Sequence, residues 1–93
     1  MNCKTCVIAP LKVFGLLDDI EEGVNRNKWA EVRRDVLDLT IEIGKMELCV
    51  ETEFAETIRH NLALLFEAVI NDDRSDTLDK VEMIRKTLIG AFP

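Results

Sequence analysis

Residues 28–50 read KWAEVRRDVLDLTIEIGKMELCV, and this stretch decides the fold. Apolar side chains recur along it in alternating steps of three and four, which is the spacing of one face of an α-helix. This face holds Trp29, Val32, Val36, Leu39, Ile43, Met46 and Val50. A second apolar stripe on the same helix holds Leu37, Ile41, Gly44 and Leu48. A helix that is apolar over most of its circumference is expected to be buried on several sides.

Three more helices are predicted by the same spacing, over residues 10–22, 53–70 and about 76–91. Their apolar faces hold Val13, Leu17, Ile20 and Val24, then Ala55, Ile58, Leu62, Leu65 and Val69, then Leu78, Val81, Ile84, Leu88 and Ala91. Pro10 suits a first helical turn, and Ser75 suits an N-cap. The sequence therefore predicts a single all-α domain over residues 1–93. We expect a four-helix bundle-like fold in which residues 1–9 are loosely ordered.

The connection between the second and third helices has two interpretations. Thr52 can cap a new helix. However, neither Gly nor Pro occurs between Lys45 and Ile70, so a continuous rod of over 40 residues is the alternative. The two-helix interpretation is the one we favour. In either case three short neighbours cannot cover both stripes of the helix at 28–50. The sequence thus predicts a homodimer, with interface contacts from Leu37, Ile41 and Leu48.

Composition and charge exclude several classes of function. The 93 residues are 47% hydrophobic and 32% charged, which is typical of a globular domain. The formal net charge of −6 argues against duplex nucleic acid or an anionic membrane as the main partner. No segment reaches the roughly 18 apolar residues that a membrane span requires. Three cysteines cannot all pair within one chain, so we expect reduced thiols and a cytoplasmic location.

Cys3-Lys4-Thr5-Cys6 is a C-x-x-C motif near the beginning of the sequence. Two thiolates supply half of a tetrahedral zinc site, and Cys49 and His60 could complete it. As a redox motif it lacks a preceding strand. The simpler hypothesis is a pair of reduced thiols in a loosely ordered segment, and no zinc is predicted.

Arg59-His60-Asn61-Leu62 holds the only histidine. The motif resembles the phosphoacceptor box of histidine kinases, and histidine-phosphotransfer domains also place a lone histidine on a four-helix bundle. The resemblance implies that the imidazole of His60 accepts a phosphoryl group, with Glu56 one turn earlier to orient the ring. The motif departs from those families because Ala63, Leu64 and Leu65 follow it. The alternative is a solvated surface histidine.

Asp18 and Glu21 are three residues apart, and so are Asp35 and Asp38 on the next helix. Two such pairs on neighbouring helices can hold Mg²⁺, which prefers carboxylate oxygens. The layout over residues 18–38 resembles the E-x-x-E and E-x-x-D pairs of MazG-type all-α nucleotide pyrophosphohydrolases. In those helical oligomers the carboxylates hold the metal. Asp takes the place of Glu at Asp18 and Asp35. The alternative is an ordinary solvated flank beside an apolar face.

The function we predict is a small acidic helical protein-interaction and assembly module without catalysis and without a cofactor. Its partners are expected to be a second copy of itself and another protein. The alternatives are a Mg²⁺-dependent pyrophosphohydrolase-like protein using Asp18, Glu21, Asp35 and Asp38, and a phosphotransfer protein using His60.

Overall fold

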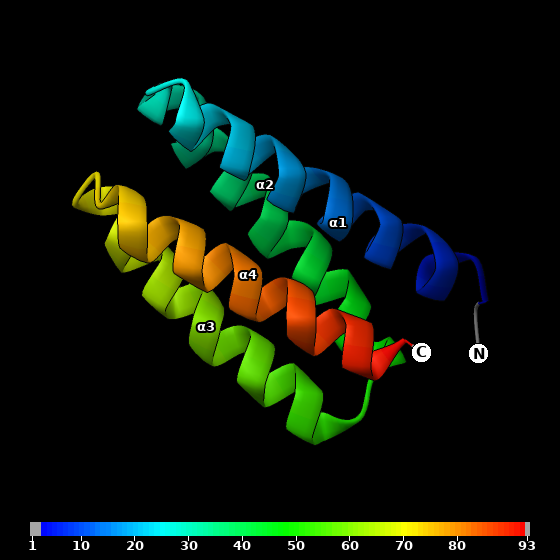
Figure 1. Ribbon diagram of the computed structural model, residues 1–93. Coiled ribbons are helices and arrows are strands. Elements are labelled where there is room, and N and C mark those ends of the chain that lie inside the picture. Colours follow the sequence, from blue (N-terminus) through cyan, green and yellow to red (C-terminus); the bar gives the residue numbers. More distant parts are fainter. Residues whose placement is uncertain (1–2, 93) are drawn as a thin grey trace.

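The computed structural model describes residues 3–92, with side chains from Cys6 onward. Four α-helices make up nearly all of this range, and it contains no strand (Figure 1). They are α1 (Cys3–Asn25), α2 (Trp29–Met46), α3 (Thr52–Ile70) and α4 (Arg74–Ala91), with a short 3-10 turn, η1 (Glu47–Cys49), after α2. The predicted all-α, four-helix bundle-like fold is confirmed.

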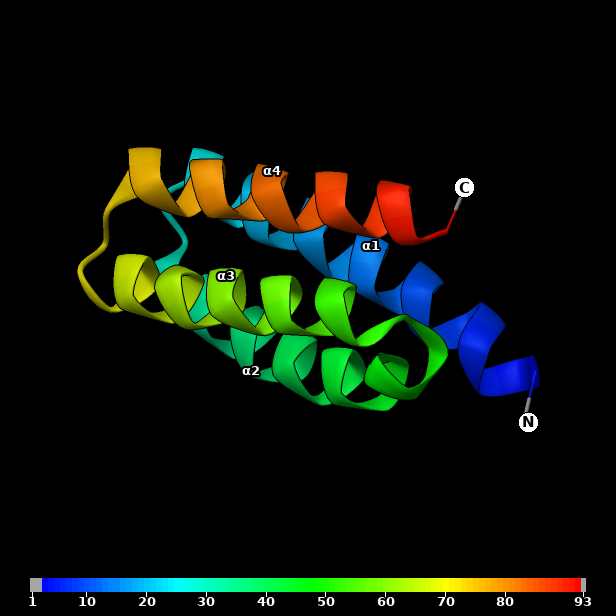
Figure 2. The ribbon, with the colours of Figure 1, turned by 90° about the horizontal axis from the view of Figure 1, so that it is seen from below.

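The helices form two antiparallel hairpins, α1–α2 and α3–α4, which lie side by side (Figure 1). Within the bundle α1 also packs against α4, and α2 against α3. The first turns of α1 extend past the end of α4 (Figure 2). Short turns join the helices of each hairpin at one end of the bundle, so both hairpins open toward the other end (Figure 2).

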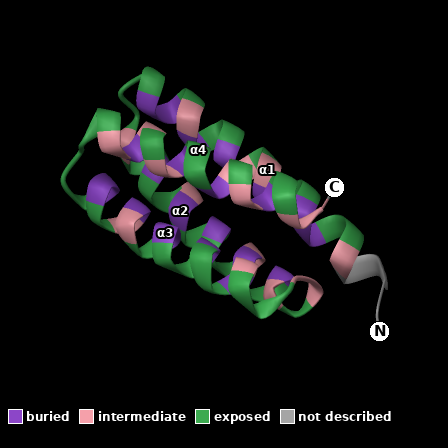
Figure 3. Ribbon diagram, turned by 60° about the horizontal axis from the view of Figure 1, so that its bottom comes forward, coloured by how far each residue is buried: buried purple, intermediate pink, exposed green. Residues whose placement is uncertain are grey.

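One hydrophobic core runs along the bundle between the four helices (Figure 3). The apolar faces predicted from the spacing supply it. Leu39, Ile43, Leu62 and Leu65, for example, are all at most 7% exposed. The second stripe of α2 faces outward instead, so that helix is covered on one side only.

The helix at 28–50 and the helix at 53–70 are separate, as the favoured interpretation has it. Val50 adopts an extended conformation between η1 and α3, which ends the helical run. Glu51 rather than Thr52 takes the N-cap position of α3. Asp73 rather than Ser75 caps α4, because its Oδ1 accepts a hydrogen bond from the Asp76 backbone N–H at 3.0 Å.

The helix start predicted at Pro10 is wrong, because α1 begins at Cys3 and Pro10 lies inside it. Proline costs a helix one backbone hydrogen bond. Here the turns before Pro10 are anchored by tertiary contacts that the sequence did not reveal. Ala9 is 3% exposed and belongs to the core, and Cys6 forms a disulfide with Cys49 beyond the end of α2.

The turn between α1 and α2 depends on two residues. Asn27 adopts a left-handed conformation with φ of 58°, which asparagine tolerates better than most residues. Gly23 is buried where α1 and α2 approach each other. A Cβ placed there would lie 2.8 Å from Cγ2 of Val32.

Gly23→Ala should therefore lower the free energy of unfolding by about 1–3 kcal/mol, the usual range for overpacking. The stiff, branched side chain of Val32 cannot rotate away easily. Gly15→Ala is the matched control, since no atom lies within 4 Å of a Cβ at Gly15. That variant should gain roughly 0.5–1 kcal/mol from helix propensity. Urea denaturation of both variants measures the difference. Equal stability of the two would contradict the close approach at Gly23.

Candidate functional site

The first carboxylate pair of the predicted metal site binds an arginine. Arg85 of α4 donates from Nη2 to Asp18 Oδ1 at 2.8 Å and from Nη1 to Glu21 Oε1 at 3.1 Å. Glu82 accepts a third bond from the same guanidinium at 2.9 Å. The two ion pairs with Asp18 and Glu21 fix α4 against α1, whereas Glu82 lies on α4 itself and orients the guanidinium. Asp18 and Glu21 thus point toward α4, and both carboxylates are engaged in ion pairs with Arg85.

The second pair, Asp35 and Asp38, lies on α2 and is close to Asp19 rather than to Asp18. The pKa of Asp35 is raised, first by burial and then by the negative charges of Asp19, Asp38 and Glu31. Within residues 6–92, whose side chains are described, no group of three or more His, Cys, Asp or Glu side chains could hold a metal ion. The four predicted carboxylates are therefore split between two surfaces.

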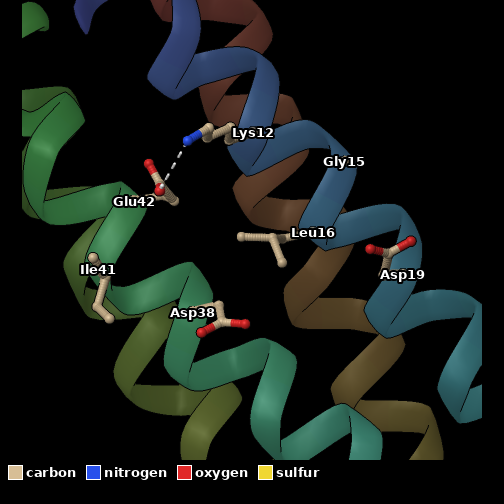
Figure 4. A pocket seen from close by; sticks show the side chains of 7 residues that line it. All are labelled: Lys12, Gly15, Leu16, Asp19, Asp38, Ile41 and Glu42. Atoms are coloured by element: carbon tan, nitrogen blue, oxygen red, sulfur yellow. Dashed lines mark ion pairs between the residues drawn. The ribbon is translucent and has the colours of Figure 1, made fainter.

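A groove of about 380 Å³ separates α1 from α2 on the side where Asp19 and Asp38 lie. Figure 4 shows Leu16 of α1 pointing across it, with Asp19 on one wall and Asp38 on the other. Lys12 spans its upper part toward Glu42, with Nζ 3.8 Å from Oε1 (Figure 4). A second hollow of about 210 Å³ begins at Asp19 and continues along the same two helices. The surface combines an apolar floor with acidic walls.

The raised pKa of Asp35 sets a pH dependence. A carboxyl group whose pKa is higher in the folded than in the unfolded state destabilises the fold when it is ionised. The cost is present at neutral pH and disappears as pH falls through the raised value. Asp35→Asn should therefore raise the melting temperature at pH 7, by an amount worth less than about 1 kcal/mol for a partly exposed group.

At about pH 3, below the ordinary value of 3.8, Asp35→Asn and the wild type should melt together. Glu56→Gln, which removes an exposed carboxylate beyond the first turn of α3, serves as the control and should be neutral at both pH values. A melting temperature of Asp35→Asn below that of the wild type at pH 7 would contradict the mutual repulsion of these carboxylates.

The cysteines are arranged differently from the prediction of reduced thiols. Cys6 of α1 and Cys49 of η1 form a disulfide, with their Cα atoms 5.4 Å apart. Two of the four suggested zinc ligands are thereby bonded to each other. The side chain of Cys3 lies outside the described residues. The disulfide closes the open end of the α1–α2 hairpin.

His60 is exposed on α3, and Glu56 is exposed one turn before it. Arg59, the preceding residue, binds Glu47 of η1 with Nε 2.7 Å from Oε1. The imidazole is thus accessible, which a phosphoacceptor requires, and a solvated surface histidine has the same environment.

Two of the three predicted interface residues, Leu37 and Ile41, lie on the outer surface of α2, and Leu48 lies just beyond its end, in η1. Leu37 and Ile41 are each 58% exposed, and Leu48 is 87% exposed. We call these three residues the α2 strip. Beside Leu37 an apolar hollow of about 200 Å³ lies between α2 and α3, and Ile70, itself 70% exposed, forms part of its rim. Leu37 lines this hollow, so the α2 strip borders it at one end.

Comparisons with known proteins do not assign the chain to a family. No protein-family model, no curated protein and no solved structure matches it. Among the described residues, no helix combines the length and the apolar character needed to cross a membrane.

Sequence reasoning missed two charged residues that organise the acidic surfaces. Asp19 faces Asp35 and Asp38, although the i, i+3 pattern pointed to its neighbour Asp18. Arg85 binds that neighbour from 67 residues away along the chain. A lone arginine within Glu82–Lys86 gives no signal of its partners in the sequence.

Proposed function

We propose that the chain is a small acidic interaction and assembly module without catalysis, which forms a homodimer and binds another protein. The observation that carries this proposal is the exposure of the α2 strip. Isolated exposed apolar residues are ordinary on a protein surface. Leu37 and Ile41 lie one turn apart on α2, Leu37 borders an apolar hollow, and Leu48 follows in η1; apolar side chains exposed together in this way are typical of interaction sites.

In the proposed dimer the α2 strip of one copy covers the α2 strip of the other. Such an isologous contact uses the same residues twice and therefore closes at two copies. Leu48 contributes most, because it is the most exposed of the three side chains. Ile70 and the hollow beside Leu37 extend the contact toward α3.

Sedimentation equilibrium at micromolar concentration tests the dimer. The expected mass is twice the chain's 10.6 kDa. The double variant Leu37→Gln/Leu48→Gln should sediment as a monomer. Ile89→Gln on α4, which is 59% exposed and outside the α2 strip, is the control and should stay dimeric. A wild-type protein that is monomeric at high concentration would overturn the proposed dimer.

The exposure of His60 on a four-helix bundle favours one second candidate, a phosphotransfer protein. Its imidazole would accept a phosphoryl group from a partner kinase or a small phosphodonor. Incubation with phosphoramidate and intact-mass measurement tests it, with His60→Gln as the control. A mass increase that is lost in His60→Gln would support this candidate, and no increase would reject it. No comparable observation favours the pyrophosphohydrolase alternative, since Asp18 and Glu21 would first have to leave Arg85.

A further inference from the structure

The groove between α1 and α2 has the two features of a surface that receives a helix. Its floor is apolar where Leu16 of α1 points toward α2, and the neighbouring Gly15 adds no side chain to the α1 side (Figure 4). Ile41 of α2 lies only at the edge of the groove and belongs to the α2 strip. The walls of the groove are acidic, with Asp19 and Asp38 on opposite sides (Figure 4). A third helix laid along two others buries its apolar face against such a floor.

Six carboxylates line the groove and the hollow that continues it, and four of them have no cationic partner among the described side chains. Among the described side chains Asp19, Glu31, Asp35 and Asp38 take part in no ion pair. Asp18, Glu21 and Glu82 share Arg85, and the groove's own Glu42 is matched by Lys12 and Lys45. The lining of the groove and hollow holds six acidic side chains against three basic ones, Lys12, Arg26 and Lys28, so it keeps excess negative charge.

This excess negative charge indicates which kind of molecule can bind in the groove. A second copy of the chain would bring the same carboxylates and would be repelled. A metal ion is not the natural occupant either, because no three ligating side chains of the described part converge on one point. An occupant with positive charges at its edges would relieve the repulsion among Asp19, Asp35 and Asp38.

We propose that the α1–α2 groove binds a cationic amphipathic helix of another protein. The helix would lay apolar side chains over Leu16 and Gly15 and place lysine or arginine side chains against Asp19 and Asp38. From Lys12 to Gly23 the groove spans twelve residues of α1, or about 16 Å from first to last, which accommodates about three helical turns. This inference rests on the proposed function as an interaction module, but it does not depend on the dimer.

The test uses a fluorescent synthetic peptide of lysine and leucine, with all leucines on one helical face. Its affinity is measured by fluorescence anisotropy at physiological salt. Two peptides serve as controls. One has the same composition with the leucines scattered, and one has glutamate in place of lysine. The amphipathic cationic peptide should bind at least about fivefold tighter than either control, because only it matches both floor and walls.

Two double variants with the same net charge locate the binding site. Asp19→Asn/Asp38→Asn removes the two negative charges on the walls of the groove but keeps the shape of the side chains. Glu53→Gln/Glu56→Gln removes two negative charges on exposed side chains of α3. The first should weaken peptide binding about fivefold, as expected for two lost exposed ion pairs, and the second by less than about twofold. Equal weakening by both variants would overturn the proposal, since binding would then follow net charge alone. Equal binding of the scattered peptide would overturn it too.

The monomeric variant Leu37→Gln/Leu48→Gln separates this inference from the proposed dimer. Neither residue lines the groove, so the peptide should bind this variant with the wild-type affinity. If this variant is monomeric and still binds the peptide, the result supports a binding site in the groove that does not require the dimer. A dimer that forms normally but binds no peptide would reject the groove and leave the assembly proposal intact.

Discussion

Replacing Ile84 by alanine should lower the free energy of unfolding by about 2–5 kcal/mol, the range for large-to-small changes in a core. Ile84 is fully buried on α4 and belongs to the single core cluster. The substitution removes three carbon atoms and leaves a cavity that the surrounding helices can close only in part. For a domain of 93 residues this is a large share of the total stability.

Ile89→Ala is the matched control, because it makes the same chemical change five residues later on the same helix. Ile89 is 59% exposed, so little buried surface is lost and alanine gains helix propensity. Its effect should stay within about 0.5 kcal/mol. Urea titrations monitored by circular dichroism give both values. Comparable losses for the two variants would show that α4 is rotated relative to the core described above.

Cys49→Ser should destabilise the oxidised protein by up to about 4 kcal/mol, because the Cys6–Cys49 disulfide joins residues 43 positions apart and restricts the unfolded chain. Peptide mapping without reduction should recover Cys6 and Cys49 as one linked species. Reduction of the wild type should lower its stability to that of Cys49→Ser. Cys3→Ser is the control and should keep both the link and the stability. Alkylation of both Cys6 and Cys49 in the purified, unreduced protein would contradict the disulfide.

The redox state of Cys6 and Cys49 in the cell also bears on where the protein acts. Disulfides persist in oxidising compartments, whereas the cytoplasm keeps most thiols reduced. Rapid alkylation of cells before lysis distinguishes the two cases. If the protein is cytoplasmic, as proposed from the sequence, Cys6 and Cys49 should be alkylated in the cell. The stability of Cys49→Ser, which lacks the disulfide, then equals the stability of the reduced protein in the cell.

Much of the fold could be predicted because helical spacing identifies which face of each helix is buried. Val32, Val36 and Leu39 illustrate this, since each falls on the predicted face and each is at most 1% exposed. The outward stripe of α2 could be predicted in the same way, because Leu37 and Ile41 do not fall on the buried face of that helix. The break between α2 and α3 was favoured because Thr52 can cap a helix, although the extended conformation at Val50 had no glycine or proline to mark it and the cap position falls on Glu51.

The arrangement of the candidate site could not be predicted in the same way. Spacing tells which side chains share a face of one helix, but not which neighbouring helix that face meets. Asp18 and Asp19 are adjacent in sequence, yet Asp18 binds Arg85 of α4 whereas Asp19 lines the groove toward α2. The pairing of Cys6 with Cys49 likewise depends on α1 starting before Pro10. Proline usually marks the first turn of a helix, so the sequence favoured the later start.

The Cys6–Cys49 bond has a consequence for how the native bundle opens. With this bond and the turn around Asn27, α1 and α2 are joined at both of their ends, whereas α3 and α4 are joined to each other only at the turn near Asp72. Partial unfolding gains less chain entropy in a closed loop than in an open one. We therefore expect the α3–α4 hairpin to detach before the α1–α2 hairpin opens. In the oxidised protein, amide protons of α3 and α4 should exchange with solvent faster than those of α1 and α2.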